Sequence, residues 1–285
     1  MVEAVVTGSA GMLGQALMAC VPDGINARGV TRADGDLASP AGVASAIEAH
    51  SPALVIHCAA YTDVDGCERD PARAWRENAV ATRFIADACR RTGARLIFVS
   101  TDYVFDGVEP RPHVEDEAPC PINAYGESKL AGEQAVAAVA DHLTIRIQWV
   151  YGPGRRNFVS AVYDRAVRGE PLRVVANQWG CPTYTPHAAP LIWRAAVSPW
   201  SGTVHLAGAG IASWVDVARE ALAAAEIDRD VEPLDLDEWP SPARKPRFSA
   251  MALNRWAALA GEYPPEWQSG VRAYVHDHLL TEAGG

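Results

Sequence analysis

A tyrosine and a lysine in the middle of the chain have a spacing that suits proton transfer. Residues 123–130 read NAYGESKL, so Tyr125 and Lys129 stand four residues apart. On a helix this spacing puts both side chains on one face, about one turn from each other. A nearby ammonium stabilises a phenolate, so we expect Lys129 to lower the pKa of Tyr125 from its usual value of about 10. Tyr125 would then donate a proton to a carbonyl group, or accept one in the reverse reaction.

A second group of polar residues follows an apolar run. Residues 94–107 read ARLIFVSTDYVFDG, in which the apolar residues 96–99 stop at Ser100–Thr101–Asp102–Tyr103. A turn needs only the serine and the aspartate, so the added threonine and tyrosine indicate that a ligand binds there. In open α/β sheets, ligands bind beyond the carboxyl ends of parallel strands. We expect Thr101 to hydrogen-bond the substrate oxygen to which Tyr125 transfers its proton.

A glycine-rich segment near the start of the chain has the spacing of a dinucleotide-binding loop. Residues 5–14 read VVTGSAGMLG, and its three glycines directly follow an apolar run. The first glycine permits a tight turn, the second a close approach to a pyrophosphate, and the third close packing of helix on strand. The N-terminus of the following helix faces the negative charge. The residues expected to contact the dinucleotide are Gly8, Ala10, Gly11, Met12 and Leu13.

The end of the second expected strand bears on which dinucleotide binds. NAD sites commonly place a carboxylate about 20 residues further on, where it bonds the ribose 2′-hydroxyl. Here the strand ends in Val30-Thr31-Arg32, and Arg32 could face a 2′-phosphate. Asp36 and Leu37 follow where an adenine edge could rest. The sequence favours NADPH, with NADH as the alternative.

The elements that position these residues alternate along the first 150 residues. We expect strands at 4–6, 25–31, 54–57, 96–99 and 143–147, and helices at 12–21, 40–50, 71–92 and 123–140. Such alternation predicts a parallel sheet with helices on both faces. Together with the glycine loop, it predicts an α/β fold with a doubly wound sheet of the Rossmann type.

The pattern loosens after residue 151, which predicts a smaller C-terminal substrate-binding lobe. We expect helices at 157–169, 187–197 and 213–226, strands at 172–175 and 203–206, a loop over the acidic and proline-rich segment 227–246, and helix in the remainder. Residues 1–150 would form the NADP-binding domain. Residues 151–285 would mainly form the smaller lobe, with some segments returning to the larger body.

Composition and charge exclude several classes of function. The net charge of −10 argues against a nucleic-acid surface, which needs clustered positive charge. No stretch approaches the roughly 20 apolar residues that cross a bilayer, and the start lacks a basic region typical of a signal peptide. We therefore expect a cytoplasmic protein that binds neither nucleic acid nor membrane. The six cysteines contain no CxxC pair, and His276-Asp277-His278 reads as a solvated helix, so no metal is expected.

Segments spread over nearly the whole chain carry a more specific signal. They are TGSAGMLGQ at 7–15, HCAAYTDVDGCERDP at 57–71, STDYVFDG at 100–107, YGESK at 125–129, RIQWVYGPGRRNFV at 146–159, NQWGCPT at 177–183 and ARKPRFSAMAL at 243–253. The chain resembles the dTDP-4-dehydrorhamnose reductase family of extended short-chain dehydrogenases/reductases. The resemblance implies NADPH-dependent reduction of the C4 ketone of a dTDP-4-keto-6-deoxy sugar, by a monomer or a homodimer. Residues 151–285 would then mainly bind the sugar nucleotide.

The resemblance also implies roles for individual residues. Thr101, Tyr125 and Lys129 would be the catalytic trio, and Lys129 would also hold the nicotinamide ribose. The further cofactor contacts that it implies are Ala59, Ala60, Tyr61, Asn78 and Ser100. The implied contacts to sugar, diphosphate and thymidine are Thr62, Val64, Asp102, Tyr103, Trp149, Arg155, Arg156, Asn157 and Gln178. For Trp149 a core aromatic remains the alternative to a surface that packs on the C–H groups of a deoxysugar.

The chain departs from the family pattern in its second half. Asn177 begins the segment usually written DQxGxPT, and Gln15 stands where some members use a glutamate in a magnesium-bridged dimer. We prefer dTDP-4-dehydro-L-rhamnose as substrate, with another dTDP-4-keto sugar of natural-product glycosylation as the near alternative. An epimerase or dehydratase is disfavoured because dehydratases of this superfamily usually need an Asp-Glu pair after the threonine. A non-catalytic regulatory subunit of the methionine adenosyltransferase type is disfavoured by the complete trio.

Overall fold

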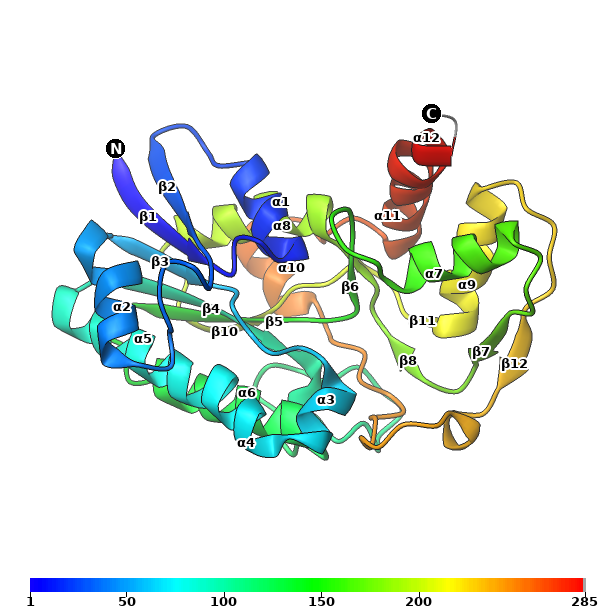
Figure 1. Cartoon of the computed structure of the whole chain (residues 1–285), viewed down its shortest axis with the longest axis horizontal. Coiled ribbons are helices and arrows are strands. Elements are labelled where there is room, and N and C mark those ends of the chain that lie inside the picture. Colours follow the sequence, from blue (N-terminus) through cyan, green and yellow to red (C-terminus); the bar gives the residue numbers. More distant parts are fainter. Residues whose placement is uncertain (284–285) are drawn as a thin grey trace.

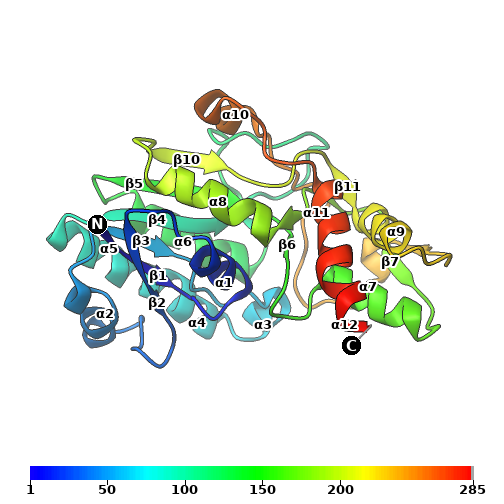
Figure 2. The same cartoon turned by 90° about the horizontal axis from the view of Figure 1, so that it is seen from above.

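The protein consists of two lobes that lie side by side, as the computed structural model shows for residues 1–283 (Figures 1 and 2). The larger lobe contains a parallel β-sheet with helices on both faces (Figure 1). The smaller lobe, on the right in Figure 1, contains helices and short pairs of strands. A short strand, β6 (Val150–Tyr151), lies between the sheet and the helices of the smaller lobe (Figure 2).

The sheet of the larger lobe has six strands within residues 1–283, in the order β10-β5-β4-β3-β1-β2, and all neighbours are parallel. The strands are β1 (Val2–Thr7), β2 (Ile25–Val30), β3 (Leu54–His57), β4 (Arg95–Thr101), β5 (His142–Ile147) and β10 (Gly202–His205). This arrangement confirms the predicted α/β fold of the Rossmann type. Strand β10 follows residue 151 in the chain, so the second half also contributes to the sheet.

Helices cover both faces of this sheet because alternate strand residues point in opposite directions. The helices are α1 (Met12–Ala19), α2 (Pro40–Ala46), α3 (Val64–Arg69), α4 (Pro71–Ala74), α5 (Ala81–Thr92), α6 (Ala124–Val136), α8 (Thr185–Ala196) and α10 (Asn254–Ala260). Val6 and Ile97 pack in one core with α1, α8 and α10. Val5 and Phe98 pack in the opposite core with α2, α5 and α6. A π-helical stretch, Trp75–Val80, joins α4 to α5, which confirms the predicted helix over 71–92.

The smaller lobe has its own buried apolar core around Val159, Val217 and Val271. Its helices are α7 (Phe158–Val167), α9 (Trp214–Ala224) and α11 (Trp267–Tyr274), and α11 continues through a π-helical stretch (Val275–Leu279) into α12 (Leu280–Ala283). Its strand pairs are β7 (Arg173–Val175) with β12 (Glu232–Leu234), β8 (Trp179–Gly180) with β11 (Ala212–Ser213), and β6 with β9 (Thr183–Tyr184). Short 3₁₀ turns lie at Glu48–His50, Asp102–Val104 and Leu236–Glu238.

Some sequence-based assignments were wrong. Residues 64–69 form α3, which was not predicted. The Asp63 side chain caps this helix, but six residues are too few to show an apolar periodicity in the sequence. The segment 227–246 is not all loop, since β12 pairs with β7 inside it. The following residues are not all helical either: Phe248 forms a bridge with Trp179, and Met251 one with His113.

Candidate active site

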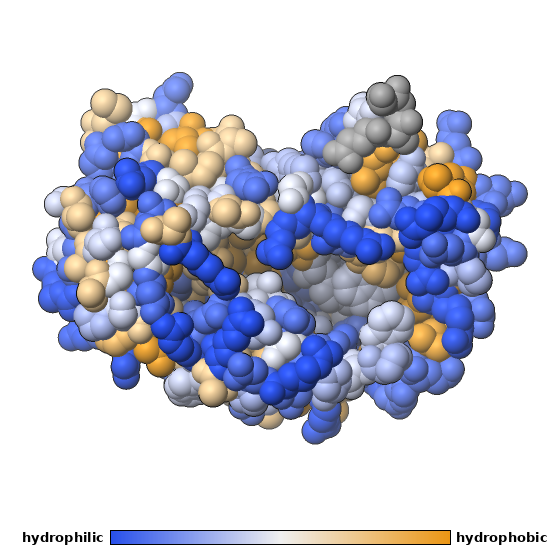
Figure 3. Space-filling view, viewed as in Figure 1, coloured by the Kyte–Doolittle hydropathy of each residue, from blue (hydrophilic) through white to orange (hydrophobic). Residues whose placement is uncertain are grey.

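A hollow opens between the two lobes, and hydrophilic residues border it (Figure 3). The carboxyl end of β5 faces the smaller lobe, because the Gln148 side chain that follows it accepts a hydrogen bond from the Cys181 N–H beyond β8. Thr101 ends the neighbouring strand β4. The polar residues that follow these strands therefore lie where the sheet meets the smaller lobe.

The glycine loop makes the close turn between β1 and α1 that the sequence predicts. Gly8 has a φ of +71°, and a Cβ atom there would lie 2.7 Å from the Ala59 nitrogen. A Cβ atom on Gly14 would lie 2.2 Å from the Gly8 oxygen. Gly11 precedes α1 without a side-chain cap, so the first N–H groups of the helix have no partner from that residue. Ala10, Met12 and Leu13 belong to the same turn.

Two of the residues predicted to select the cofactor, Arg32 and Asp36, follow β2 and form ion pairs with the helical stretch between α4 and α5. Arg32 is exposed, and its Nη2 lies 2.8 Å from Glu77 Oε2. Asp36 pairs with Arg76, which belongs to the same helical stretch as Glu77. Leu37 packs at the edge of the core beneath α2 and α5.

The loop after β3, which contains Ala59, Ala60 and Tyr61, is held by a buried asparagine. Asn78 Oδ1 accepts from the Tyr61 N–H at 2.7 Å, and Asn78 Nδ2 donates to the Tyr61 carbonyl at 3.0 Å. The same Nδ2 donates to Ser128 Oγ at 2.9 Å, and Ser128 lies on α6. Asn78 therefore joins the loop next to Gly8 to the helix that carries Tyr125.

The structure brings the catalytic trio together in the interior. Thr101 ends β4, while Tyr125 and Lys129 lie one turn apart on α6. All three are less than a tenth exposed. The Thr101 hydroxyl lies close enough to the Tyr125 phenol to lower its pKa, and the Tyr103 ring packs edge-on against the Tyr125 ring at a centroid distance of 5.7 Å. Asn123 caps α6 by accepting from the Gly126 N–H, which fixes the start of the helix.

The expected effect of Lys129 on Tyr125 was wrong. Burial raises the pKa of Tyr125 above its usual range, and the hydrogen bond with Thr101 only opposes this shift. The reason is where the ammonium points: Lys129 Nζ donates to the Val99 carbonyl at 2.8 Å and lies 4.1 Å from the centre of the Phe98 ring. The pKa of Lys129 is lowered to about 8 because burial disfavours the charged ammonium, and the negative charge of Glu133 only partly opposes this shift.

Several residues predicted for the sugar lie around Tyr125. Val64, at the start of α3, and Tyr103 pack in the same apolar cluster as Tyr125. Thr62 is exposed just before this helix. Asp102 is different, because its side chain is buried and both of its carboxylate oxygens accept hydrogen bonds from neighbouring protein groups.

Trp149 sits at the joint between the lobes in an unusual backbone conformation. Its φ is +44°, a value that costs energy for a bulky residue. Its ring stacks on Trp214 of α9, with centroids 3.6 Å apart and an angle of 10° between the planes. Its buried indole nitrogen has no hydrogen-bond partner within residues 1–283. The structure therefore places Trp149 in an aromatic pair with the smaller lobe.

The residues predicted for diphosphate and thymidine fall into two groups. Arg155 and Arg156 are exposed in the turn before α7, where Arg156 is 4.0 Å from Asp164. Asn157 caps α7 and donates to the Tyr274 hydroxyl at 2.9 Å. Gln178 is buried and holds separate segments together: its Nε2 donates to the Pro246 carbonyl at 3.1 Å, and its Oε1 accepts from the Trp214 indole at 2.9 Å.

Buried polar residues that sequence reasoning missed support the same region. Ser100 Oγ donates to Glu133 Oε1 at 2.6 Å, and Arg146 donates to both oxygens of Glu133 at 2.9 and 2.7 Å. Gln148 binds the Asp102 carboxylate from the end of β5. For Gln148 alone a local signal was available, a polar residue directly after an apolar strand, although that signal does not reveal its partners; Glu133 on α6 and Arg146 within β5 carried no such signal.

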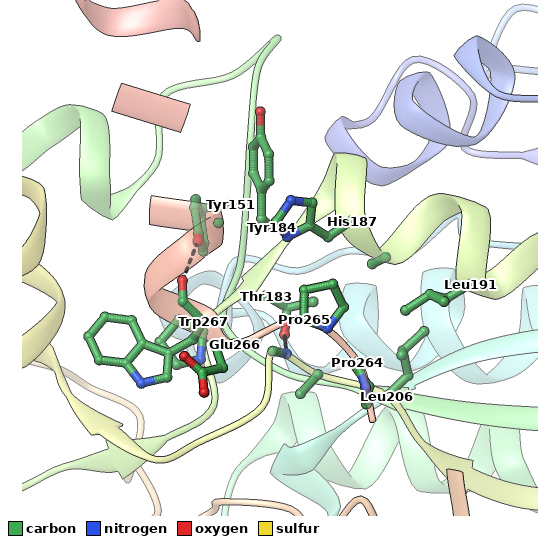
Figure 4. Close-up of a pocket in the computed structure, with 15 residues that line it drawn as sticks. Tyr151, Thr183, Tyr184, His187, Leu191, Leu206, Pro264, Pro265, Glu266 and Trp267 are labelled. Atoms are coloured by element: carbon green, nitrogen blue, oxygen red, sulfur yellow. Dashed lines mark hydrogen bonds between the residues drawn. The ribbon is translucent and has the colours of Figure 1, made fainter. Parts of the chain in front are cut away.

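A separate small pocket lies between α8, β9 and α11 (Figure 4). Tyr151, Tyr184, His187, Pro265 and Trp267 line it, and Figure 4 shows their rings around the space. None of its lining residues within 1–283 belongs to the predicted site. This pocket is therefore separate from the predicted catalytic residues Thr101, Tyr125 and Lys129.

Within 1–283 we find no group of three or more His, Cys, Asp and Glu side chains that could hold a metal ion. His276, Asp277 and His278 lie in the π-helical stretch after α11. Over the same residues, every helix is too short or too polar to span a membrane.

Comparison with known proteins then identifies the family. The model of the family described as "RmlD substrate binding domain" matches residues 2–280. The chain belongs to this family. A "dTDP-4-dehydrorhamnose reductase" of Mycobacterium tuberculosis is 39% identical over 277 residues, which cover 94% of this chain and 90% of the relative. A "probable dTDP-4,6-dihydroxy-2-methyloxan-3-one 4-ketoreductase" of Streptomyces antibioticus is 36% identical and covers 97% of this chain and 96% of its own length.

A solved structure from this reductase group shares the whole fold. It is the dTDP-4-dehydrorhamnose reductase of Bacillus anthracis in complex with NADP, with a TM-score of 0.93 and 32% identity. The superposition covers 97% of this chain and 99% of that one. Likeness over the full length includes both lobes, so the predicted relation to the reductase family is confirmed.

Proposed function

We propose that this protein is an enzyme that uses NADPH to reduce the C4 ketone of a dTDP-4-keto-6-deoxy sugar. The preferred substrate is dTDP-4-dehydro-L-rhamnose, and the product is dTDP-L-rhamnose. The observation that carries the proposal is the burial of Thr101, Tyr125 and Lys129 together at the end of β4. Relatives named for two such ketones, each matching more than nine tenths of this chain, support the substrate class.

The residues around the β1–α1 turn fit a dinucleotide. A Cβ atom on Gly8 or Gly14 would collide with the backbone, so only glycine permits this close turn, which sets the N-terminus of α1 directly after β1, the arrangement that binds a pyrophosphate in dinucleotide sites. We assign the turn to the pyrophosphate, Arg32 to the 2′-phosphate, and Asp36 and Leu37 to the adenine side. The loop held by Asn78 would border the nicotinamide side. When bound, NADPH supplies the hydride.

Tyr125 supplies the proton in this reaction. Its raised pKa keeps the phenol protonated at neutral pH, so it gives up the proton only to a strong base. The alkoxide that forms at C4 when hydride adds to the carbonyl is such a base. The proton moves from the Tyr125 oxygen to that alkoxide and leaves a phenolate, which solvent reprotonates. Thr101 hydrogen-bonds the same substrate oxygen, and Lys129 holds the nicotinamide ribose.

The sugar nucleotide would lie in the hollow between the lobes (Figure 3). Thr62, Val64 and Tyr103 would contact the sugar from the larger lobe, and Trp149 from the joint. Arg155 and Arg156 suit the diphosphate, because a guanidinium donates two parallel hydrogen bonds to its oxygens. Their exposure before α7 leaves both forks accessible.

Turnover of the keto sugar tests the proposal directly. dTDP-4-dehydro-L-rhamnose is made from dTDP-glucose with the upstream enzymes, which are then removed by ultrafiltration, and NADPH oxidation is followed by absorbance. Rapid oxidation with formation of dTDP-L-rhamnose is expected. If the protein reduces a different dTDP-4-keto sugar and not this one, the proposed substrate is wrong but the proposed reaction stands. NADPH binding without reduction of any keto sugar would contradict the proposed activity.

Two accompanying choices, the cofactor and the oligomeric state, need one measurement each. Parallel assays with NADPH and NADH give the cofactor preference, for which Arg32 favours NADPH. Sedimentation of the protein with and without cofactor decides between a monomer and a homodimer, the two states that we propose.

A further inference from the structure

One segment of the chain is bonded to both elements that carry the catalytic trio. This crossing segment, residues 243–249, leads from the smaller lobe back toward α10 of the larger one (orange, lower centre of Figure 1). Asn123 Nδ2 donates to the Arg244 carbonyl at 2.8 Å, and Asn123 is the cap of α6. Ser249 Oγ donates to Asp102 Oδ2 at 2.6 Å, directly after the end of β4. The crossing segment therefore joins the start of α6 to the end of β4.

Gln148 completes this connection from the end of β5. Its Nε2 lies 2.7 Å from Asp102 Oδ2, 2.7 Å from Ser249 Oγ and 2.9 Å from the Ser249 carbonyl. Its Oε1 accepts from the Cys181 N–H at 2.7 Å, which ties it to the smaller lobe. Gln148 is 1% exposed and Ser249 is fully buried, so neither side chain lies at the surface of the hollow. Every polar group of this amide is used inside the protein.

The group that Gln148 and Ser249 hold is the carboxylate next to the catalytic threonine. Asp102 Oδ2 accepts from both of them, while Asp102 Oδ1 accepts from the Thr101 hydroxyl at 3.1 Å. Since the Thr101 hydroxyl donates to Asp102, the lone pairs of its oxygen are free to accept from the Tyr103 N–H at 3.2 Å, and they lie beside the Tyr125 phenol, whose pKa Thr101 lowers. The position of the carboxylate thus sets the direction of the threonine hydroxyl.

We propose that Gln148 and Ser249 are positioning residues: they fix the Asp102 carboxylate and, through it, hold the Thr101 hydroxyl against Tyr125. This inference rests on the proposed reductase function and names residues that act on the reaction without contacting the sugar or the cofactor. A misplaced threonine would lose its bond to the carbonyl in the transition state. Removing either positioning side chain should therefore lower kcat more than it changes cofactor binding.

The ionisation of Asp102 provides a readout that a purely structural role would not move. Burial raises the pKa of Asp102 to about 6, and the hydrogen bonds from Ser249 and Gln148 oppose this shift. The titratable groups that face Asp102 are Tyr103, Tyr125 and Cys181, whose pKa values are all raised by burial. These three groups titrate far above pH 6. We therefore expect the fall of kcat at acid pH, the acid limb of the profile, to follow the protonation of Asp102. Loss of the Ser249 donor must move that limb to higher pH.

The test compares Ser249→Ala with wild type and with a matched control. kcat for NADPH oxidation with purified dTDP-4-dehydro-L-rhamnose is measured from pH 5 to 9, and NADPH affinity by fluorescence titration. For Ser249→Ala we expect a kcat roughly tenfold lower at neutral pH, an acid limb shifted upward, and unchanged NADPH affinity. The control is Ser213→Ala, which removes a buried serine that also bonds an aspartate, at the cap of α9. It should keep the wild-type kcat and pH profile.

Other outcomes are equally decisive. Wild-type kcat and acid limb in folded Ser249→Ala would overturn the inference while leaving the reductase function standing. A wild-type protein that binds NADPH but reduces no keto sugar would overturn both. If Ser249→Ala does not fold, Asp102→Asn replaces it, because that change keeps the shape of the side chain and removes its titration. A lower kcat without an acid limb near pH 6 would support the inference, and a wild-type profile would refute it.

Discussion

The predicted site residues of the two lobes are held in different ways. In the larger lobe, Gly8 directly follows β1 and Thr101 is the last residue of β4, so the backbone ladder of parallel strands places them. In the smaller lobe and its joint, Trp149, Asn157 and Gln178 are placed by side-chain contacts. Their partners are Trp214 for Trp149, Tyr274 for Asn157, and Trp214 together with Pro246 for Gln178.

This difference leads to different expectations for substitutions. A residue placed by the sheet can lose its functional group while its neighbours stay in position, so one step of the reaction should fail. Substituting a residue that is placed by side-chain contacts removes its function and its contacts together. The effects of such a substitution and of a substitution at its partner should therefore not be additive. Four predictions test this contrast.

The largest effect is expected from Tyr125→Phe in the larger lobe. Removing the phenol oxygen takes away the proton donor and should lower kcat about 10²- to 10⁴-fold, with NADPH affinity unchanged. Tyr163→Phe on α7 is the matched control and should keep wild-type turnover. Equal turnover by Tyr125→Phe and wild type would remove the tyrosine from the mechanism. If neither wild type nor Tyr125→Phe reduces a keto sugar and both bind a partner protein, the protein is a regulatory subunit and not an enzyme.

The second largest effect is expected on stability, from breaking the buried ion pair between Arg146 and Glu133 in the larger lobe. Arg146→Met leaves the Glu133 carboxylate buried without its partner, which should lower the free energy of unfolding by about 3–5 kcal/mol. Arg272→Met in the smaller lobe removes a pair with Glu220 in which the arginine is 59% exposed, and should cost at most about 1 kcal/mol. Urea unfolding of both variants measures the difference. Equal losses for the two variants would contradict the expectation that the buried Arg146–Glu133 pair contributes more to stability than the exposed Arg272–Glu220 pair.

NADPH affinity should depend on pH through Lys129. Burial lowers the pKa of this ammonium to about 8, so it is charged below that pH and becomes neutral above it. If the charged form holds the nicotinamide ribose, affinity is constant well below pH 8, has fallen about twofold at the pKa and about tenfold one pH unit above it. His57 and Cys58, which interact with Lys129, have pKa values of about 3 and 12 and do not titrate in this range.

Fluorescence titrations of NADPH from pH 6 to 9.5 measure this dependence. Lys129→Met should bind NADPH more weakly and with a flat profile over the same range. A flat profile for the wild-type protein would show that the ammonium does not contribute to cofactor binding.

The fold, and the fact that Thr101, Tyr125 and Lys129 lie together, were predictable because their signals are local. A glycine loop after a strand, a polar end on an apolar run, and an i,i+4 pair on a helix each occupy fewer than about ten residues. The direction of Lys129 was not predictable, because its acceptor is the Val99 carbonyl on a strand 30 residues away. Spacing on a helix establishes which residues share a face, but not which partner a long side chain chooses.

The supporting residues were missed for the same physical reason. Ser249 meets Asp102 across 147 positions of sequence, and Gln148 meets Ser249 across 101. Such pairs form only when the crossing segment returns from the smaller lobe, so no local pattern encodes them. The same holds for Gln178, which was predicted as a ligand contact and is found bonded to Pro246 and Trp214.

Trp149→Ala should have the smallest effect on turnover and the clearest coupling. An aromatic pair is worth about 0.5–1.5 kcal/mol beyond its buried area, so KM for the keto sugar should rise about 2- to 12-fold, with a smaller change in kcat. Because the ring stacks on Trp214, the double variant Trp149→Ala/Trp214→Ala should cost less than the sum of the single changes. Trp200→Ala, which disrupts an edge-on pair with Trp256 in the larger lobe, should leave KM unchanged. Additive effects of the two tryptophans on KM would mean that Trp149 contacts the sugar independently of its stack, as a residue of the larger lobe would.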